Sequence, residues 1–209
     1  MRTKTLLLSA VLGLASVAGS VADTFSVNVV GYVNKTIPQG FSIINNPLVS
    51  SNNTVATLIP NPPLFSTIYK FGPGGFEPNT FGFGGWGDAA MTFAPGQGAF
   101  FNSPETFTNT FVGEVLTGTL TNGLPPGFSL VGSKVPQSGS LQTTLGLTPN
   151  LFDTVYTFDT ANQQYVPNTF GFGGWGSGEP QIGVAEGFFY LNEQSSTNNW
   201  VRTFNPNNP

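Results

Sequence analysis

Two glycine-rich stretches are the parts of this chain that come nearest to a known chemical motif. Residues 82–87 and 171–176 both read GFGGWG, which fits the G-x-G-x-x-G spacing of dinucleotide-binding loops. Such a loop must open a helix whose N-terminus faces the pyrophosphate. No helical pattern follows either stretch, and Pro95 and Pro180 come soon after. The spacing therefore does not predict a nucleotide site.

The aromatic side chains of these stretches offer other roles. Phe83, Trp86, Phe172 and Trp175 could plug the end of a β unit, since aromatic side chains usually bury large areas. If they are exposed instead, the same four residues become ligand-binding candidates, with Trp86 and Trp175 as stacking platforms for sugar rings. A third role is an aromatic surface that mates with another chain. The sequence leaves these three alternatives open.

The chain contains few residues of the types that perform acid–base catalysis or bind metals. The chain has no His and no Cys, so the usual general base and the usual metal ligands are missing. A carboxylate pair of the glycosidase type remains, with Asp153 and Glu186 as the candidate pair. Asp153 aligns with Ser66 in the other copy, and loop capping explains such acids equally well. Residues 159–162 carry too few oxygen ligands for calcium. We therefore expect no enzymatic activity, no metal and no cofactor.

A tandem duplication positions these residues. The ten letters PNTFGFGGWG occupy residues 78–87 and recur without change at 167–176. Such a recurrence indicates a repeated unit of about 87–89 residues. We expect the first β unit to span residues 23–112 and the second to span residues 113–205, followed by a polar tail at 206–209.

The first 22 residues have the features of a secretory signal peptide. Arg2 and Lys4 precede an apolar run over residues 5–17, and small residues around Ala22 provide the cleavage site. The apolar run is shorter than the roughly 20 residues that a bilayer requires, so we expect no membrane span. The mature chain, which begins at Asp23, is expected to be secreted, either extracellular or periplasmic.

Low charge excludes one class of partner and indicates a folded chain. The sequence has 6 Lys and Arg against 10 Asp and Glu, and only 8% of its residues are charged. Nucleic acid requires clustered Lys and Arg to neutralise phosphates, so a nucleic-acid partner is not expected. The 20 Phe, 5 Tyr and 3 Trp residues supply enough apolar surface for an ordered domain.

Short β-strands account for most of the sequence pattern. Residues 23–34 are rich in Val and aromatic residues, and residues 67–71 and 154–158 place Tyr and Phe on one face. Residues 54–59 and 141–145 are long enough only for one or two helical turns. We expect an all-β fold of two tandem units, each sandwich-like or barrel-like.

Three motifs resemble a secreted β repeat module. Residues 40–47 (GFSIINNP), 68–71 (IYKF) and 94–101 (APGQGAFF) resemble its pattern of G-W-N-L-I-x-N-P, V-Y-x-Y/F and P-G-x-G-F-F. The module is found in exported, surface-associated bacterial proteins, often verrucomicrobial or Bacteroidetes-like sequences. Phe41 and Phe128 stand where its pattern usually has Trp. The resemblance implies a fold and carries no catalytic residues.

The two ends of the chain suggest self-association. Residues 111–120 join the units, and their two halves resemble the C-terminal and N-terminal strands. The C-terminal strand of one molecule could therefore dock on the N-terminal strand of the next and build a filament. The alternative is that both end strands pair within their own sheets. The candidate residues for self-association are Val27, Val29, Val33, Trp200, Val201 and Phe204.

These observations favour a secreted, non-enzymatic structural or cell-surface interaction protein that self-assembles end to end. The alternative is a carbohydrate-binding module that uses the glycine-rich aromatic loops. The expected partner is accordingly either a second copy of this chain or an extracellular polysaccharide.

Overall fold

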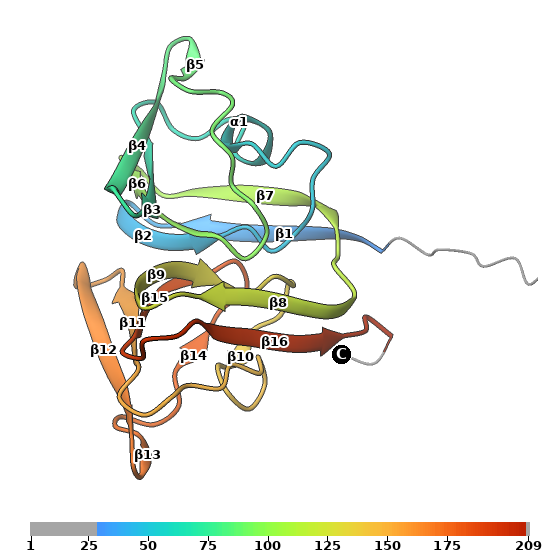
Figure 1. Ribbon diagram of the computed structural model, residues 1–209. Coiled ribbons are helices and arrows are strands. Elements are labelled where there is room, and N and C mark those ends of the chain that lie inside the picture. The colour runs from blue at the N-terminus through green and yellow to red at the C-terminus, as the bar shows by residue number, and fades with distance from the viewer. Residues whose placement is uncertain (1–28, 208–209) are drawn as a thin grey trace, which may run out of the picture.

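The computed structural model describes residues 29–207, and these form two similar all-β units (Figure 1). Unit 1 consists of β1 (Val30–Ile37), β2 (Gly40–Asn45), α1 (Val55–Leu58), β3 (Thr67–Gly72), β4 (Gly75–Gly82), β5 (Gly85–Trp86), β6 (Gly98–Ser103) and β7 (Phe107–Glu114). Unit 2 consists of β8 (Gly118–Leu124), β9 (Gly127–Gly132), β10 (Gly139–Ser140), β11 (Thr154–Asp159), β12 (Gln164–Gly171), β13 (Gly174–Trp175), β14 (Gln181–Ile182), β15 (Gly187–Asn192) and β16 (Asn198–Phe204). The predicted signal peptide and Val27 lie outside the described residues.

Each unit packs a five-stranded sheet against a two-stranded ribbon. The sheet of unit 1 has the order β2-β6-β3-β4-β5, and its ribbon pairs β1 with β7. Unit 2 repeats this arrangement as β9-β15-β11-β12-β13, with a ribbon of β8 and β16. Of the two predicted alternatives, sandwich-like units are therefore confirmed.

Side-chain alternation explains how each sheet presents two apolar faces. Ile68 of β3 and Val155 of β11 are fully buried in the cores of their own units. Successive side chains of a strand point to opposite faces, so the neighbouring tyrosines, Tyr69 and Tyr156, point away from those cores. The predicted strands at 67–71 and 154–158 are confirmed. Residues 54–59 contain the short helix α1, whereas residues 141–145 form a turn.

The end strands pair within their own units. β1 pairs with β7 in antiparallel register, and β16 pairs with β8 in the same way. This is the second of the two arrangements considered for the chain ends. β1 begins at Val30 and runs on to Ile37, so it overlaps the end of the strand expected at 23–34, of which residues 23–28 lie outside the described residues.

The two units meet through a pseudo-twofold junction. The Asn45 N–H donates to Ala185 O at 3.2 Å, and the equivalent Gly132 N–H donates to Gly96 O at 3.0 Å. Around these bonds lies a third apolar cluster, which both five-stranded sheets supply. Its buried members are Ile43, Phe100, Leu130 and Phe189.

Two equivalent glycines allow the backbones of the units to approach at this junction. A Cβ added to Gly98 would lie 2.8 Å from the Val131 backbone nitrogen of the other unit. A Cβ added to Gly187 would lie 2.8 Å from the Ile44 carbonyl oxygen. Both distances are shorter than a real Cβ contact, so any larger residue must push the units apart.

We predict that Gly98→Ala lowers the free energy of unfolding by about 1–3 kcal/mol, because an added methyl group overpacks a filled junction. Urea denaturation of the purified protein would measure the change. Gly74→Ala is the matched control, since a Cβ there meets nothing within 4 Å. Equal stability of both variants would contradict a tightly packed junction.

Candidate functional site

A groove lined with aromatic rings runs between the two units. The sheet faces that point toward the junction carry five aromatic side chains from each unit. They are Phe41, Tyr69, Phe71, Phe76 and Phe100 from unit 1, and Phe128, Tyr156, Phe158, Tyr165 and Phe189 from unit 2. Each residue of the first set has its repeat equivalent in the second.

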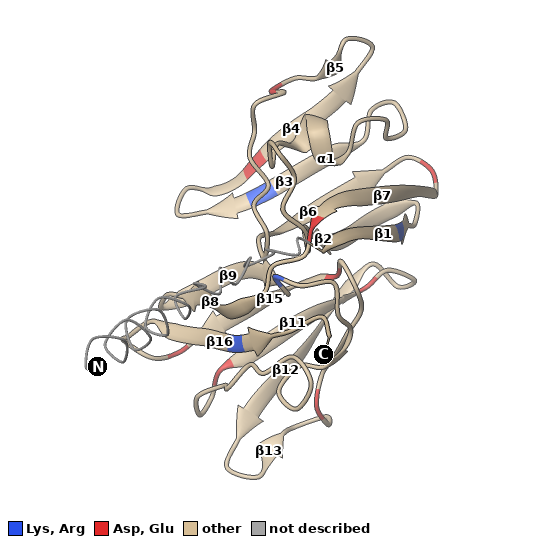
Figure 2. Cartoon of the chain, turned by 90° about the vertical axis from the view of Figure 1, so that its right-hand side faces the viewer, with Lys and Arg blue, Asp and Glu red and all other residues tan. Residues whose placement is uncertain are grey.

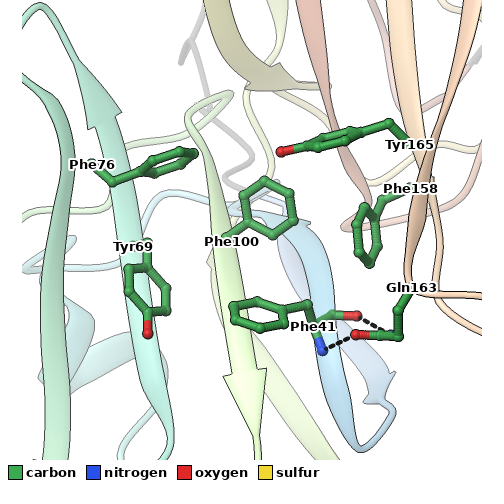
Figure 3. Close-up of a pocket in the computed structure, with 7 residues that line it drawn as sticks. All are labelled: Phe41, Tyr69, Phe76, Phe100, Phe158, Gln163 and Tyr165. Carbon is green, nitrogen blue, oxygen red and sulfur yellow. Dashed lines mark hydrogen bonds between the residues drawn. The ribbon is translucent and has the colours of Figure 1, made fainter.

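The groove contains two hollows that share part of their walls. The larger has a volume of about 410 Å³, and the residues that line it are shown in Figure 3: Phe41, Tyr69, Phe76, Phe100, Phe158, Gln163 and Tyr165. The smaller has a volume of about 270 Å³ and is lined by Phe71, Phe76, Phe128, Tyr156, Tyr165 and Phe189. Phe76 and Tyr165 belong to both walls, so the two hollows lie next to each other in the groove.

Edge-to-face contacts across the junction fix the positions of these rings. The Phe100 and Phe158 centroids are 5.3 Å apart at an interplanar angle of 89°, and the Phe71 and Phe189 centroids are 5.1 Å apart at 87°. Such contacts stabilise aromatic pairs beyond simple burial. Around this fixed base, four rings remain about two-fifths to one-half exposed: those of Phe41, Phe76, Phe128 and Tyr165.

Gln163 makes the two hollows different. It belongs to the longer turn between β11 and β12, and its Oε1 accepts the Phe41 N–H at 2.7 Å while its Nε2 donates to Phe41 O at 3.0 Å. Gly40 has a φ of 88°, which favours glycine, and a Cβ there would lie 2.9 Å from the same Oε1. The amide of unit 2 thus closes one side of the larger hollow.

The groove offers neutral polar groups and no formal charge. None of the described residues that line the two hollows is ionised at neutral pH. The Tyr165 hydroxyl is neutral at pH 7 even at the ordinary tyrosine pKa of about 10, and burial raises its pKa further. Lys70, next to Tyr69 on β3, extends from the opposite face, where its Nζ donates to Thr92 Oγ1 at 3.3 Å. The few Lys and Arg residues are scattered through the chain (Figure 2).

The repeated decapeptide forms a hairpin tip in each unit instead of a nucleotide loop. Phe81 pairs with Trp86, and Gly82 pairs with Gly85, so a two-residue turn lies between β4 and β5. β12 and β13 repeat this register. Asn79 fixes the following segment, because its Nδ2 donates to Asp88 O at 2.7 Å and its Oδ1 accepts the Asp88 N–H at 3.0 Å.

Both tryptophans of the decapeptide are at least partly buried. Trp86 is only 7% exposed, its Nε1 donates to Ile59 O at 2.8 Å, and its ring packs on Phe81. Of the alternatives left open for Trp86, burial within its own unit is therefore confirmed and an exposed stacking platform is wrong. Trp175 is half-buried, with its Nε1 donating to Gln142 Oε1 at 3.1 Å. Trp86 belongs to the apolar core of unit 1, and Trp175 packs against the apolar core of unit 2.

The phenylalanines of the tips are the exposed members of the predicted set. Phe83 is 90% exposed and Phe172 is 88% exposed. Each ring contacts a second exposed phenylalanine edge to face. Phe83 lies 5.8 Å from Phe65, and Phe172 lies 5.7 Å from Phe152.

A β-bulge aims Phe65 at the tip. Phe65 and Ser66 together oppose Phe81, since the Phe65 N–H donates to Phe81 O and the Phe81 N–H donates to Ser66 O, both at 2.8 Å. Phe65 has a φ of 68°, a left-handed conformation that favours glycine. Phe152 repeats the bulge with a φ of 72°. Sequence reasoning missed both residues, because a phenylalanine gives no signal of a positive φ.

Three of the five described residues predicted for end-to-end contact face inward. The side chains of Val33, Trp200 and Phe204 are buried in their own units, so they are not available as contact residues. Val201 is exposed and Val29 is partly exposed.

The predicted carboxylate pair has structural hydrogen bonds instead of a shared cleft. Asp153 is fully buried, and it accepts hydrogen bonds from the Tyr190 hydroxyl and from the N–H groups of Asn150 and Glu193. Burial and the neighbouring carboxylate raise the pKa of Tyr190.

Glu186 also has a structural role that needs no charge. Its Oε2 accepts the Gly183 N–H at 3.1 Å. Gln97, its repeat equivalent, makes the same bond to the Ala94 N–H at 3.1 Å. An amide and a carboxylate thus perform one task in the two units, which is loop capping.

Comparison with known proteins gave no match to a family model, a curated protein or a solved structure. Within residues 29–207, no His, Cys, Asp and Glu side chains form a group of three able to hold a metal. The same part of the chain has no helix long and apolar enough to cross a membrane.

We predict that Phe65→Gly does not lower the free energy of unfolding and raises it by up to about 1 kcal/mol, because glycine relieves the left-handed strain. Thermal and urea unfolding would measure this. Phe65→Ala keeps the strain and serves as the matched control. A loss of more than about 1 kcal/mol in the glycine variant would mean that the ring itself stabilises the fold.

We predict that Asp153→Asn lowers the free energy of unfolding by about 1–3 kcal/mol, because the amide leaves a buried donor without its acceptor. The comparison variant Glu186→Gln should have nearly unchanged stability, since Gln97 already makes the equivalent bond. A reversed order of the two effects would contradict the structural assignment of Asp153.

Proposed function

We propose that this protein is a secreted, non-enzymatic binding protein that holds an uncharged glycan in the aromatic groove between its units. The observation that carries the proposal is the groove itself, in which ten aromatic residues and one glutamine surround two adjacent hollows. A polysaccharide partner was one of the two expected from the sequence, although the residues now proposed are different. Membership of a secreted β repeat module stays a prediction.

The chemistry of the groove fits a sugar chain better than a charged ligand. Half-exposed rings such as Phe41 and Phe128 offer apolar faces on which the C–H side of a sugar can stack. A sugar also has hydroxyl groups at its edges, which need neutral hydrogen-bonding partners. Tyr165 extends its hydroxyl into the larger hollow near Phe100 (Figure 3). A few polar groups in a mainly aromatic wall are typical of small-molecule sites.

The adjacency of the hollows favours a ligand of more than one sugar ring. Phe76 and Tyr165 line both hollows, so the hollows are neighbours in the groove and a linear glycan of several rings could contact both. The pseudo-twofold relation provides similar stacking surfaces at successive positions. Binding without hydrolysis is consistent with Asp153 and Glu186, which serve as hydrogen-bond acceptors elsewhere in the fold.

We predict that Phe41→Ala and Phe128→Ala each weaken glycan binding at least tenfold, about 1.4 kcal/mol, because each removes an exposed stacking face. Affinity electrophoresis in gels containing a soluble β-glucan, xylan or mannan would measure retardation, with alginate as the polyanionic comparison. Calorimetry with the matching oligosaccharide would then give the dissociation constant.

Two controls make this experiment specific. Tyr32→Ala removes an aromatic residue that is 72% exposed on β1, outside the groove, and should leave binding unchanged. Tyr165→Phe keeps the ring and should weaken binding less than Tyr165→Ala. Equal retardation of the wild type and the folded groove variants on every neutral polysaccharide would overturn the proposal.

A further inference from the structure

We propose that the two hairpin tips are the surfaces through which copies of this chain associate, tip against tip, into a linear assembly. Each tip consists of one exposed phenylalanine from the hairpin turn and one from the bulge. The tip of unit 1 is Phe83 with Phe65, and the tip of unit 2 is Phe172 with Phe152. This inference is independent of glycan binding in the groove.

Backbone strain is the first observation that indicates a function for the tips. Two phenylalanines occupy left-handed positions in which glycine would be favoured, with φ values of 68° and 72°. Neither ring enters a core, since Phe65 is 61% exposed and Phe152 is 53% exposed. Residues with strained backbone persist only where the surrounding structure holds them in place, and they cluster at functional sites. Here the strained backbone places each ring against a second exposed ring, which widens the aromatic surface of the tip.

The arrangement of the tips selects a second copy of the chain as the partner. The β4–β5 and β12–β13 hairpins lie at opposite ends of the molecule in both views (Figures 1 and 2). A flat surface such as a membrane can therefore meet only one tip of a given molecule. A row of copies uses both tips, because each tip has the same decapeptide in the same hairpin register.

Identity of the two tips also determines the kind of assembly. A patch that pairs with its own equivalent forms an isologous contact, which closes a dimer when a molecule has one such patch. This chain has two, so each contact leaves a free tip at either end and growth continues. The decapeptide itself contains no charged residue; the exposed Asp88 follows it in unit 1, whereas the neutral Ser177 follows it in unit 2.

The size of the patches predicts weak and reversible association. Four rings meet in one tip-to-tip contact, and aromatic side chains bury roughly 150–250 Å² each, which gives at most about 600–1,000 Å². Stable interfaces bury about 1,200–2,000 Å², so a single contact falls below that range. Pro78 on β4 and Pro167 on β12 also lack the N–H groups that strand pairing along those edges would need.

The experiment is sedimentation equilibrium of the purified mature chain over a wide concentration series. For the wild type, the weight-average mass should rise with concentration beyond that of a dimer. Phe83→Ala retains one tip, so its mass should stop at the dimer. The double variant Phe83→Ala/Phe172→Ala should stay monomeric at every concentration. Both phenylalanines are almost fully exposed, so folding should be unaffected.

Controls separate this inference from its alternatives. Tyr32→Ala should associate like the wild type, because its ring is exposed away from the tips. Phe65→Gly/Phe152→Gly should lose association while unfolding at the same or a higher temperature. A wild type that stays monomeric at the highest concentration would overturn the proposal. A weight-average mass of the double tip variant that rises with concentration as in the wild type would also overturn it. So would a wild type that does not self-associate and instead co-sediments with phosphatidylcholine vesicles through its tips.

Discussion

The rest of the structure depends on the close backbone approach at Gly98 and Gly187. Only residues without a side chain let β6 and β15 lie against the neighbouring unit at these positions. This contact brings the outer faces of both five-stranded sheets together, and without it the rings of Phe100 and Phe189 would be exposed to water. The same contact creates the groove, because the sheets touch along the junction and leave hollows beside it. It also directs the two hairpin tips to opposite ends of the molecule (Figure 1).

Duplication supplies two different kinds of surface from one unit. Where the units face each other, equivalent residues of both units line a single groove. A residue present in only one unit therefore makes the two hollows of the groove different. Gln163 occurs only in the longer turn of unit 2, and it binds the Phe41 backbone of unit 1. Where the units face away from each other, equivalent residues remain separate and give the molecule two like ends. Phe65 and Phe152 have the same strained conformation because each tip is built by its own unit alone.

Much of the local structure could be predicted from the sequence, whereas the aromatic groove and the exposed hairpin tips could not. The duplication, the strands at 67–71 and 154–158 and the absence of a helix after the glycine-rich stretches are all visible as periodicity and turn residues. The groove depends on how two units pack, and no pattern within one unit specifies that packing. For Trp86 the sequence offered burial and exposure as alternatives and could not decide between them, because exposed and buried tryptophans have similar sequence surroundings in a glycine-rich stretch. One signal was present: Asp153 and Tyr190 together replace Ser66 and Phe101 in the other copy, which is what a hydrogen-bonded pair would require.

The most direct test of the groove as a binding site is a crystal structure of residues 23–209 grown with a neutral oligosaccharide that they bind. We expect the sugar to lie across both hollows, with one ring stacked on Phe41 or Phe128 and a hydroxyl group bonded to Tyr165 or Gln163. A structure with the oligosaccharide bound on another surface, and the aromatic rings collapsed together to fill the groove, would contradict the central claim that this junction is a binding site.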